Sequence, residues 1–342
     1  MRARWKETRQ ILKKLTWSRM LNIFQVWLSF YLSKLIQGLQ PRAPIAVSIE
    51  PTTACNLGCP ECPSGLKMFD RPTGNAQIEN VKNWLDQLKK RTLYVNFYFQ
   101  GEPFIHPGFL QMVRLAAERG LYTSTSTNAH FLHDDLARKT VESGLDRLIV
   151  SIDGLTQEVY ETYRINGQLA KVLEGTKRIV HWKKELNSAT PLVVFQFLVV
   201  APNEHQMSGV LQLANDLGVD EVRFKTAQVY NYEHGHALIP KNEKYSRYRR
   251  NDDGTYSVKN AMDNHCWRMW SGCVMTWDGR VVPCCFDKDA THALGSLNES
   301  RFFDIWKGAP YRAFRQSVMS GRANIDICSN CSEGTKVWAP IE

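Results

Sequence analysis

The chain has 342 residues, of which 43% are hydrophobic and 23% are charged, a composition that is ordinary for a globular protein and excludes disorder as its main state. Its net charge of +9 is concentrated at the start, because residues 1–40 hold eight Lys or Arg and a single acid, Glu7. The rest of the chain therefore carries only +2. This near-neutrality excludes a general polyanion-binding face, and we expect no nucleic-acid partner.

Residues 1–44 are predicted to form a basic N-terminal helical arm. The uncharged run from Met20 to Ser33 has 14 residues, fewer than the roughly 18 expected of a membrane span, and no cleavage site of a signal peptide follows it. Two interpretations stay open. Either the apolar face of this helix packs across one end of the next domain, or residues 1–39 make a peripheral contact with the anionic inner face of a membrane. The protein is expected in the cytoplasm in both cases.

From residue 45 onward, strand-like and helix-like segments alternate. Strands are predicted at 45–52, 92–99, 121–127, 147–152, 191–200 and 219–226. Helices are predicted at 77–90, 107–119, 132–143, within 156–186, and at 203–217. Several of the strands lack polar alternation, which is typical of strands covered on both faces. Six such repeats predict an α/β core over residues 45–226 with a parallel sheet and right-handed crossovers.

Two further segments complete the predicted organisation. Residues 227–262 are polar and rich in Tyr, Asn, Lys and Arg, and are interpreted as a connector. Residues 263–342 form a second, cysteine-rich unit.

The most specific motif is a loop directly after the first predicted strand, where Cys55, Cys59 and Cys62 are spaced as Cys-x3-Cys-x2-Cys. A [4Fe–4S] cluster is normally held by four thiolates, so three leave one iron open to an outside ligand. Local zinc motifs instead pair Cys-x2-Cys elements about 12–20 residues apart. A disulfide framework is typical of small chains in oxidising compartments. Nine cysteines in a long chain do not match that pattern.

This spacing resembles the signature of the radical S-adenosylmethionine (SAM) superfamily. The resemblance implies a partial (β/α)6 TIM-like barrel, a [4Fe–4S] cluster whose open iron binds SAM, and cleavage of SAM to a 5′-deoxyadenosyl radical. Two positions depart from the family pattern. Gln100 stands where the first glycine of Gly-Gly-Glu-Pro is usual, and Glu61 stands where an aromatic residue often covers the adenine.

Polar residues at the carboxyl ends of the predicted strands are candidate SAM contacts, because reactive groups of parallel α/β barrels cluster there. The resemblance implies that the Gly-Glu-Pro turn meets the SAM amino group and that short polar side chains and an arginine meet the ribose and the carboxylate. A helix N-cap or a turn is the alternative role for Ser151 and Asp153. The candidates are Gly101, Glu102, Pro103, Asn128, Ser151, Asp153 and Arg164.

The cysteine-rich unit carries a second pattern. Cys266 is followed by Gly279, Cys284 and a distant Cys328-x2-Cys331 pair, which resembles the SPASM/twitch extension of the same superfamily. Asp278-Gly279 predicts a hairpin turn. The resemblance implies that Cys266, Cys284, Cys328 and Cys331 hold a second, auxiliary [4Fe–4S] cluster. A four-cysteine zinc site and a replacement of Cys284 by Cys285 remain open.

Together these features predict a radical SAM oxidoreductase that abstracts hydrogen from its substrate. An auxiliary cluster favours a net oxidation, such as dehydrogenation of a sugar or aminocyclitol alcohol. The alternatives are a maturase of a ribosomally made peptide and a non-catalytic iron–sulfur or zinc scaffold. Expected partners are a small-molecule or peptide substrate and an electron donor such as flavodoxin or ferredoxin. No residue is assigned as the catalytic acid or base.

Overall fold

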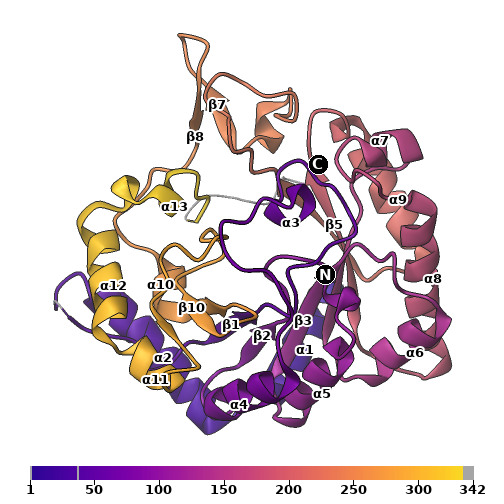
Figure 1. Cartoon of the computed structure of the whole chain (residues 1–342). Helices are drawn as coiled ribbons and strands as arrows, with labels where there is room; N and C mark the ends of the chain where they lie inside the picture. The colour runs from indigo at the N-terminus through magenta and orange to yellow at the C-terminus, as the bar shows by residue number, and fades with distance from the viewer. Residues whose placement is uncertain (1, 37, 334–342) are drawn as a thin grey trace.

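The core of the molecule is a parallel sheet whose strands alternate with helices, seen in a computed structural model that describes residues 2–36 and 38–333 (Figure 1). Each core strand lies inside the segment predicted for it, and neighbouring strands from β1 to β6 pair in parallel. The predicted α/β fold, with six parallel strands separated by helices, is therefore confirmed. The core strands are β1 (Ala46–Ile49), β2 (Tyr94–Asn96), β3 (Tyr122–Thr127), β4 (Arg147–Ser151), β5 (Leu192–Val199) and β6 (Glu221–Thr226).

Amphipathic helices cover the outer face of this sheet. Helix α4, for example, buries Val81, Trp84, Leu85 and Leu88, which share one face because their spacing follows the helical period. Strands β3, β4 and β5 are buried at most positions on both faces, as their apolar sequences indicate, whereas β1, β2 and β6 are only partly buried. The core helices are α3 (Pro63–Leu66), α4 (Ile78–Leu88), η1 (Pro103–Ile105), α5 (Phe109–Glu118), α6 (Asp134–Glu142), α7 (Gln157–Glu161), α8 (Leu169–Glu185), η2 (Glu204–Gln206) and α9 (Met207–Leu217).

The cysteine-rich unit shares the core sheet. Its first strand, β9 (Gly272–Met275), pairs in parallel with β1, and β10 (Arg280–Val282) and β11 (Gly295–Ser296) follow antiparallel. The sheet order is β11-β10-β9-β1-β2-β3-β4-β5-β6. Gly279 turns the predicted hairpin with φ +88°, a conformation that favours glycine. The helices of this unit are α10 (Trp267–Ser271), α11 (Phe302–Trp306), α12 (Ala309–Gly321), η4 (Arg322–Asn324) and α13 (Asp326–Ser329).

Between core and cysteine-rich unit, the connector contains η3 (Glu243–Tyr245) and a small hairpin, β7 (Tyr248–Arg250) with β8 (Tyr256–Val258). This hairpin projects at the top of the molecule in Figure 1. These two strands were not predicted, because the connector sequence shows no sustained apolar alternation.

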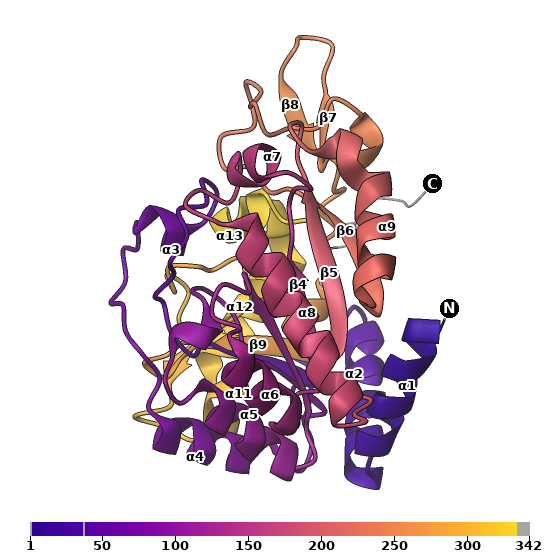
Figure 2. The same ribbon diagram turned by 90° about the vertical axis from the view of Figure 1, so that its right-hand side faces the viewer.

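The N-terminal arm forms two helices, α1 (Arg2–Lys14) and α2 (Trp17–Leu32), which lie side by side against the body in Figure 2. Helix α1 meets the amino ends of the core strands, because Glu7 pairs with Arg147 at 2.6 Å and with Arg223 at 3.1 Å. Within the described residues, no helix is long and apolar enough to cross a bilayer. The cysteine loop lies at the opposite, carboxyl end of the strands.

Helix α2 packs on the body through a mixed stripe and leaves part of its apolar surface exposed. Val26 and Phe30 pack on the hydrophobic core, but the buried side chains also include Arg19, Asn22 and Ser29. The reason is the surface beneath, which presents carbonyl oxygens at the ends of α4 and α5. Arg19 donates to the carbonyls of Lys89 at 2.8 Å, Arg119 at 3.1 Å and Gly120 at 2.5 Å, and a cation is favourable at a helix C-terminus.

Candidate functional site

The three cysteines of the first motif lie in the loop between β1 and α3. Cys59 is buried, and Cys55 and Cys62 are half-buried. Cys62 is the N-cap of α3, and a Cβ added to Gly65 would lie 2.6 Å from the Cys59 backbone nitrogen, so the helix packs directly on the loop. Burial, together with the neighbouring Glu102 and thiols, raises the pKa of Cys55 to about 12. Binding of a metal cluster would have to deprotonate these thiols.

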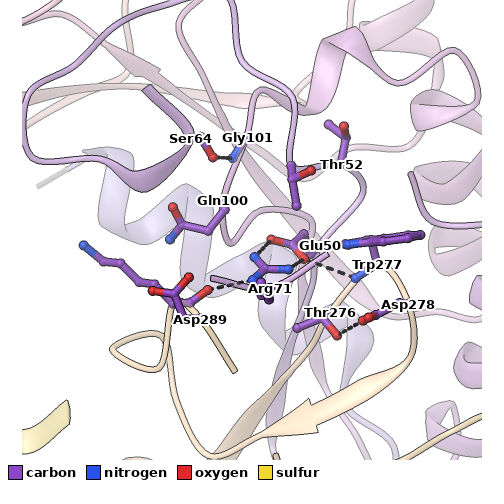
Figure 3. Close-up of polar contacts among 12 residues, drawn as sticks. Glu50, Thr52, Ser64, Arg71, Gln100, Gly101, Thr276, Trp277, Asp278 and Asp289 are labelled. Carbon is purple, nitrogen blue, oxygen red and sulfur yellow. Dashed lines mark hydrogen bonds and ion pairs between the residues drawn. The ribbon is translucent and has the colours of Figure 1, made fainter. Parts of the chain in front are cut away.

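The Gly-Glu-Pro turn packs against the end of β1. Gly101 has φ +75°, and a Cβ there would lie 2.3 Å from the Thr52 carbonyl oxygen. Its N–H donates to Ser64 Oγ at 2.8 Å (Figure 3). Only glycine fits this contact, because both the space and the backbone conformation exclude a side chain. Pro103 follows as the first residue of η1.

Glu102 fixes the turn to the end of β3. Its buried carboxylate accepts hydrogen bonds from Thr127 Oγ1 at 2.8 Å, from the Asn128 N–H at 2.7 Å and from the Phe104 N–H at 3.2 Å. Burial raises the pKa of Glu102 to about 7, and these hydrogen bonds oppose the rise. The Asn128 amide donates in turn to Asn56 Oδ1 at 2.8 Å. Glu102 and Asn128 thereby join the cysteine loop, the turn and β3 into one unit.

At the ends of β4 and β5, Asp153 and Arg164 form an ion pair of 2.5 Å. Asp153 is fully buried and also accepts the Leu198 N–H at 2.6 Å. Arg164 extends from this pair to the first cluster loop, with Nη1 3.7 Å from Cys59 Sγ. Ser151 is buried at the end of β4, in register with Gln196 of β5. Contacts of these residues with SAM stay a prediction.

The four predicted auxiliary cysteines, Cys266, Cys284, Cys328 and Cys331, line one small cavity in the C-terminal unit. Cys285 does not line it, whereas Cys284 lines both this cavity and a neighbouring one of about 90 Å³ that Cys285 also lines. This arrangement favours Cys284 over Cys285 as the fourth thiol. Among the described residues, no three His, Cys, Asp or Glu side chains meet the geometry of a single-ion site.

An arginine that the sequence analysis missed lies beside these four thiols. Arg322 is only 2% exposed and donates through Nη2 to Cys331 Sγ at 3.2 Å. Its Nε is buried without a hydrogen-bond partner, which is costly unless negative charge is close. The backbone N–H of Glu333 also donates to Cys331 Sγ, at 3.3 Å. A cation and an amide directed at sulfur fit an anionic cluster held by thiolates.

A buried ion pair that was also not predicted from the sequence joins the two cysteine-bearing regions. Glu50 and Arg71 form a bidentate ion pair at 2.6 and 2.8 Å, with side chains 0% and 1% exposed. Figure 3 shows the pair between the Trp277 turn and the cysteine loop. Glu50 also accepts the Trp277 N–H at 3.2 Å, and Arg71 donates to the Lys288 carbonyl at 2.8 Å. The base of the first loop is thus fixed to the auxiliary unit.

Between the two sets of cysteines the surroundings are electropositive. Cys285 lies within electrostatic range of four cations from four different segments: Lys225, Arg247, Arg268 and Lys288. Burial and the neighbouring cations lower the pKa of Lys225. Only the spatial arrangement reveals this cluster, since its members are far apart in the sequence.

Comparison with known families agrees with this geometry. Residues 49–198 match the family described as "Radical SAM superfamily", and residues 266–332 match "SPASM: Iron-sulfur cluster-binding domain". The chain belongs to the radical SAM superfamily and carries a C-terminal SPASM domain. The first domain implies a [4Fe–4S] cluster with SAM, and the second implies auxiliary iron–sulfur binding. The superfamily is one of enzymes, so the scaffold alternative loses its support.

Curated relatives differ in what they do. The chain is 26% identical over 313 residues to a tungsten-containing aldehyde ferredoxin oxidoreductase cofactor-modifying protein of Pyrococcus furiosus, covering 83% of this chain and 86% of the relative. It is 23% identical over 334 residues to an AdoMet-dependent heme synthase of Methanosarcina barkeri, covering 85% and 91%. A PqqA peptide cyclase of Bradyrhizobium diazoefficiens is 27% identical over 202 residues, covering 58% and 50%.

Solved structures support the fold. BtrN in complex with AdoMet and 2-DOIA matches with a TM-score of 0.53 at 18% identity, covering 85% of this chain and 93% of BtrN. SuiB of Streptococcus suis bound to precursor peptide SuiA matches with a TM-score of 0.63 at 14% identity, covering 89% and 74%. At such low identity these matches show the fold alone.

Proposed function

We propose that the chain is a radical SAM oxidoreductase that removes hydrogen from its substrate in a net oxidation. When bound, the cluster and SAM supply a 5′-deoxyadenosyl radical for hydrogen abstraction, and an auxiliary cluster supplies an electron acceptor. The observation that carries the proposal is the cavity lined by Cys266, Cys284, Cys328 and Cys331. Four protein thiolates leave no iron open for substrate, so electron acceptance is the role that suits this site.

The protein residues would then have separate tasks. Cys55, Cys59 and Cys62 would hold the first cluster, and Gly101 would let the turn backbone approach SAM. Glu102 and Asn128 position the loop through the hydrogen bonds described above. Arg322 and the Glu333 N–H would stabilise negative charge at the auxiliary site. Flavodoxin or ferredoxin is the proposed electron donor.

Two substrate classes fit this proposal. The first is an alcohol of a sugar or aminocyclitol, whose dehydrogenation would pass one electron of the substrate to the auxiliary cluster. The second is a ribosomally made peptide, supported by the relatives named as PqqA peptide cyclases. Both reactions remove two hydrogens in net terms, so the electron-acceptor role is common to them. The peptide alternative is as well supported as the alcohol alternative.

Iron analysis after anaerobic reconstitution tests the two sites. The wild type should hold about eight irons per chain, and the Cys55→Ala/Cys59→Ala/Cys62→Ala variant should hold about four. Cys284→Ser should also lose about four irons, whereas the adjacent control Cys285→Ser should lose none. Four irons and one zinc in the wild type would identify the C-terminal site as a zinc site and contradict the acceptor role.

A second experiment tests the oxidation itself. The Cys328→Ala/Cys331→Ala variant should still cleave SAM, because the first site lies in the core, but it should not yield oxidised product. With a peptide or sugar substrate, the wild type should consume about one SAM per product, because the abstracted hydrogen leaves with 5′-deoxyadenosine. Many products per SAM would indicate an isomerisation instead.

A further inference from the structure

Helix α2 of the arm buries several polar side chains beside Val26 and Phe30 and turns a second apolar side to solvent. The buried positions Arg19, Asn22, Val26 and Ser29 are spaced by three and four residues and form one stripe along the helix. The opposite side is solvent-exposed and aromatic: Phe24 is 57% exposed, Trp27 49% and Tyr31 55%. An apolar side turned to solvent departs from the pattern expected of a surface helix in a globular protein.

The exposed apolar side chains are concentrated in the arm. The described residues include seventeen exposed large hydrophobic side chains, and eleven of them lie between Trp5 and Ile36. Single exposed hydrophobic residues need no explanation, but a contiguous set of this size marks an interaction surface. The eleven, here called the arm face, are Trp5, Leu12, Trp17, Met20, Leu21, Phe24, Trp27, Leu28, Tyr31, Leu35 and Ile36.

A groove adjoins the arm face. It has a volume of about 660 Å³, and Leu28, Leu32, Ile36 and Leu39 contribute to its apolar lining. Three exposed cations also line it: Arg42, Lys307 and Arg312. A lining that combines apolar side chains with exposed cations matches a molecule that has hydrocarbon chains and an anionic head group.

The charges around the arm face point to the same partner. Every charged side chain of the described arm is basic except Glu7, which is turned inward to Arg147 and Arg223. Arg9, Lys13 and Lys34 are exposed. A partner protein would need a matching acidic and apolar surface, whereas an anionic bilayer offers both properties without a specific shape.

We propose that the arm face docks on an anionic lipid bilayer, with α2 lying in the plane of the interface. The helix has 16 residues, too few to span but sufficient to bury one apolar side at the boundary between head groups and acyl chains. Trp and Tyr side chains suit this boundary because they combine an apolar ring with a polar group. The groove would take a lipid head group at Arg42, Lys307 and Arg312. Since the arm lies at the amino ends of the strands, the cysteine loop faces away from the membrane.

The test is cosedimentation of the full chain with vesicles of phosphatidylcholine, with and without phosphatidylglycerol. The apolar variant is Phe24→Ser/Trp27→Ser/Leu28→Ser, whose side chains are exposed, so the fold should persist. Its control is Leu186→Ser/Leu211→Ser, directly after α8 and on α9, where Leu186 is 38% and Leu211 37% exposed, compared with 37% for Leu28. The charge variant is Arg9→Gln/Lys13→Gln/Lys34→Gln. Circular dichroism and thermal unfolding establish that each variant is folded.

The wild type should bind the vesicles and bind more tightly when phosphatidylglycerol is present. The apolar variant should lose vesicle affinity by about tenfold or more, and the control pair should not. The charge variant should still bind vesicles, but the presence of phosphatidylglycerol should no longer increase its affinity for them. The proposal is overturned if the wild type does not sediment with vesicles, or if the apolar variant binds as well as the wild type. A wild-type dimer in analytical ultracentrifugation that dissociates in the apolar variant would show that a second copy covers the face.

Discussion

Replacement of Arg71 by methionine should strongly destabilise the fold, because it leaves the Glu50 carboxylate buried without its partner. Both side chains are at most 1% exposed, so the small values typical of surface ion pairs do not apply. Removal of one partner of a buried pair typically costs about 3–5 kcal/mol. The remaining Trp277 N–H, at 3.2 Å from Glu50, offsets part of this, so we expect a loss of about 3 kcal/mol.

The loss should also depend on pH. Burial raises the pKa of Glu50, and the hydrogen bonds and charge of Arg71 oppose that rise, so the variant raises it further. Below the raised folded pKa of Glu50 in the wild type, the carboxyl is protonated in both folded proteins and the difference in stability between them is smallest. As the pH rises from there toward the still higher folded pKa of the variant, the difference should grow by up to about 1.4 kcal/mol per pH unit.

Urea unfolding of wild type, Arg71→Met, Glu50→Gln and the double variant, each at pH 5 and pH 7, measures both effects. The double variant should recover part of the stability lost in Arg71→Met, since no unpaired charge remains. The argument would be refuted if the losses of stability in the two single variants add up in the double variant. It would also be refuted if wild type and Arg71→Met differ in stability by the same amount at both pH values.

Two further predictions concern the cluster sites. Gly101→Ala should lower the free energy of unfolding by about 2–3 kcal/mol, because the added Cβ would lie 2.3 Å from the Thr52 carbonyl oxygen at a residue with positive φ. The control Gly254→Ala, with φ +84° and no contact within 3.9 Å, should lower it by only about 1 kcal/mol. Equal losses of stability in urea unfolding would contradict the steric argument. Arg322→Met should lower the midpoint potential of the auxiliary site by on the order of tens of millivolts, measured in a redox titration followed by electron paramagnetic resonance. The exposed control Arg312→Met should leave this potential unchanged. An unchanged potential in Arg322→Met would exclude the electrostatic role of Arg322.

The strands and the two cysteine sets could be predicted from the sequence because their signals are local. Apolar runs such as 191–200 predict a covered strand without knowledge of its neighbours. Cys55, Cys59 and Cys62 lie within one loop, so their meeting depends on few other residues. The auxiliary cysteines are separated by up to 65 positions, from Cys266 to Cys331, and only the family resemblance indicated that they meet.

Buried ionic partners were missed because pairing leaves no periodic signal. Glu50 and Arg71 are 21 residues apart and meet only because the loop returns to the end of β1. The polar part of the buried stripe of α2 was not predicted, for a related reason. Periodicity shows which side of a helix is apolar, but the surface beneath decides which side is buried. Here that surface presents carbonyl oxygens, which Arg19 and Asn22 satisfy.

The distribution of charge around the sulfurs bears on the proposed reaction. Arg164 lies 3.7 Å from a sulfur of the first loop, whereas Arg322 lies 3.2 Å from an auxiliary sulfur. Arg164 is neutralised by the fully buried Asp153, but no ion pair of Arg322 is found among the described residues. Uncompensated positive charge beside a cluster favours its reduced form. The auxiliary site is therefore expected to be the easier of the two to reduce, which is the direction that an acceptor of a substrate electron requires.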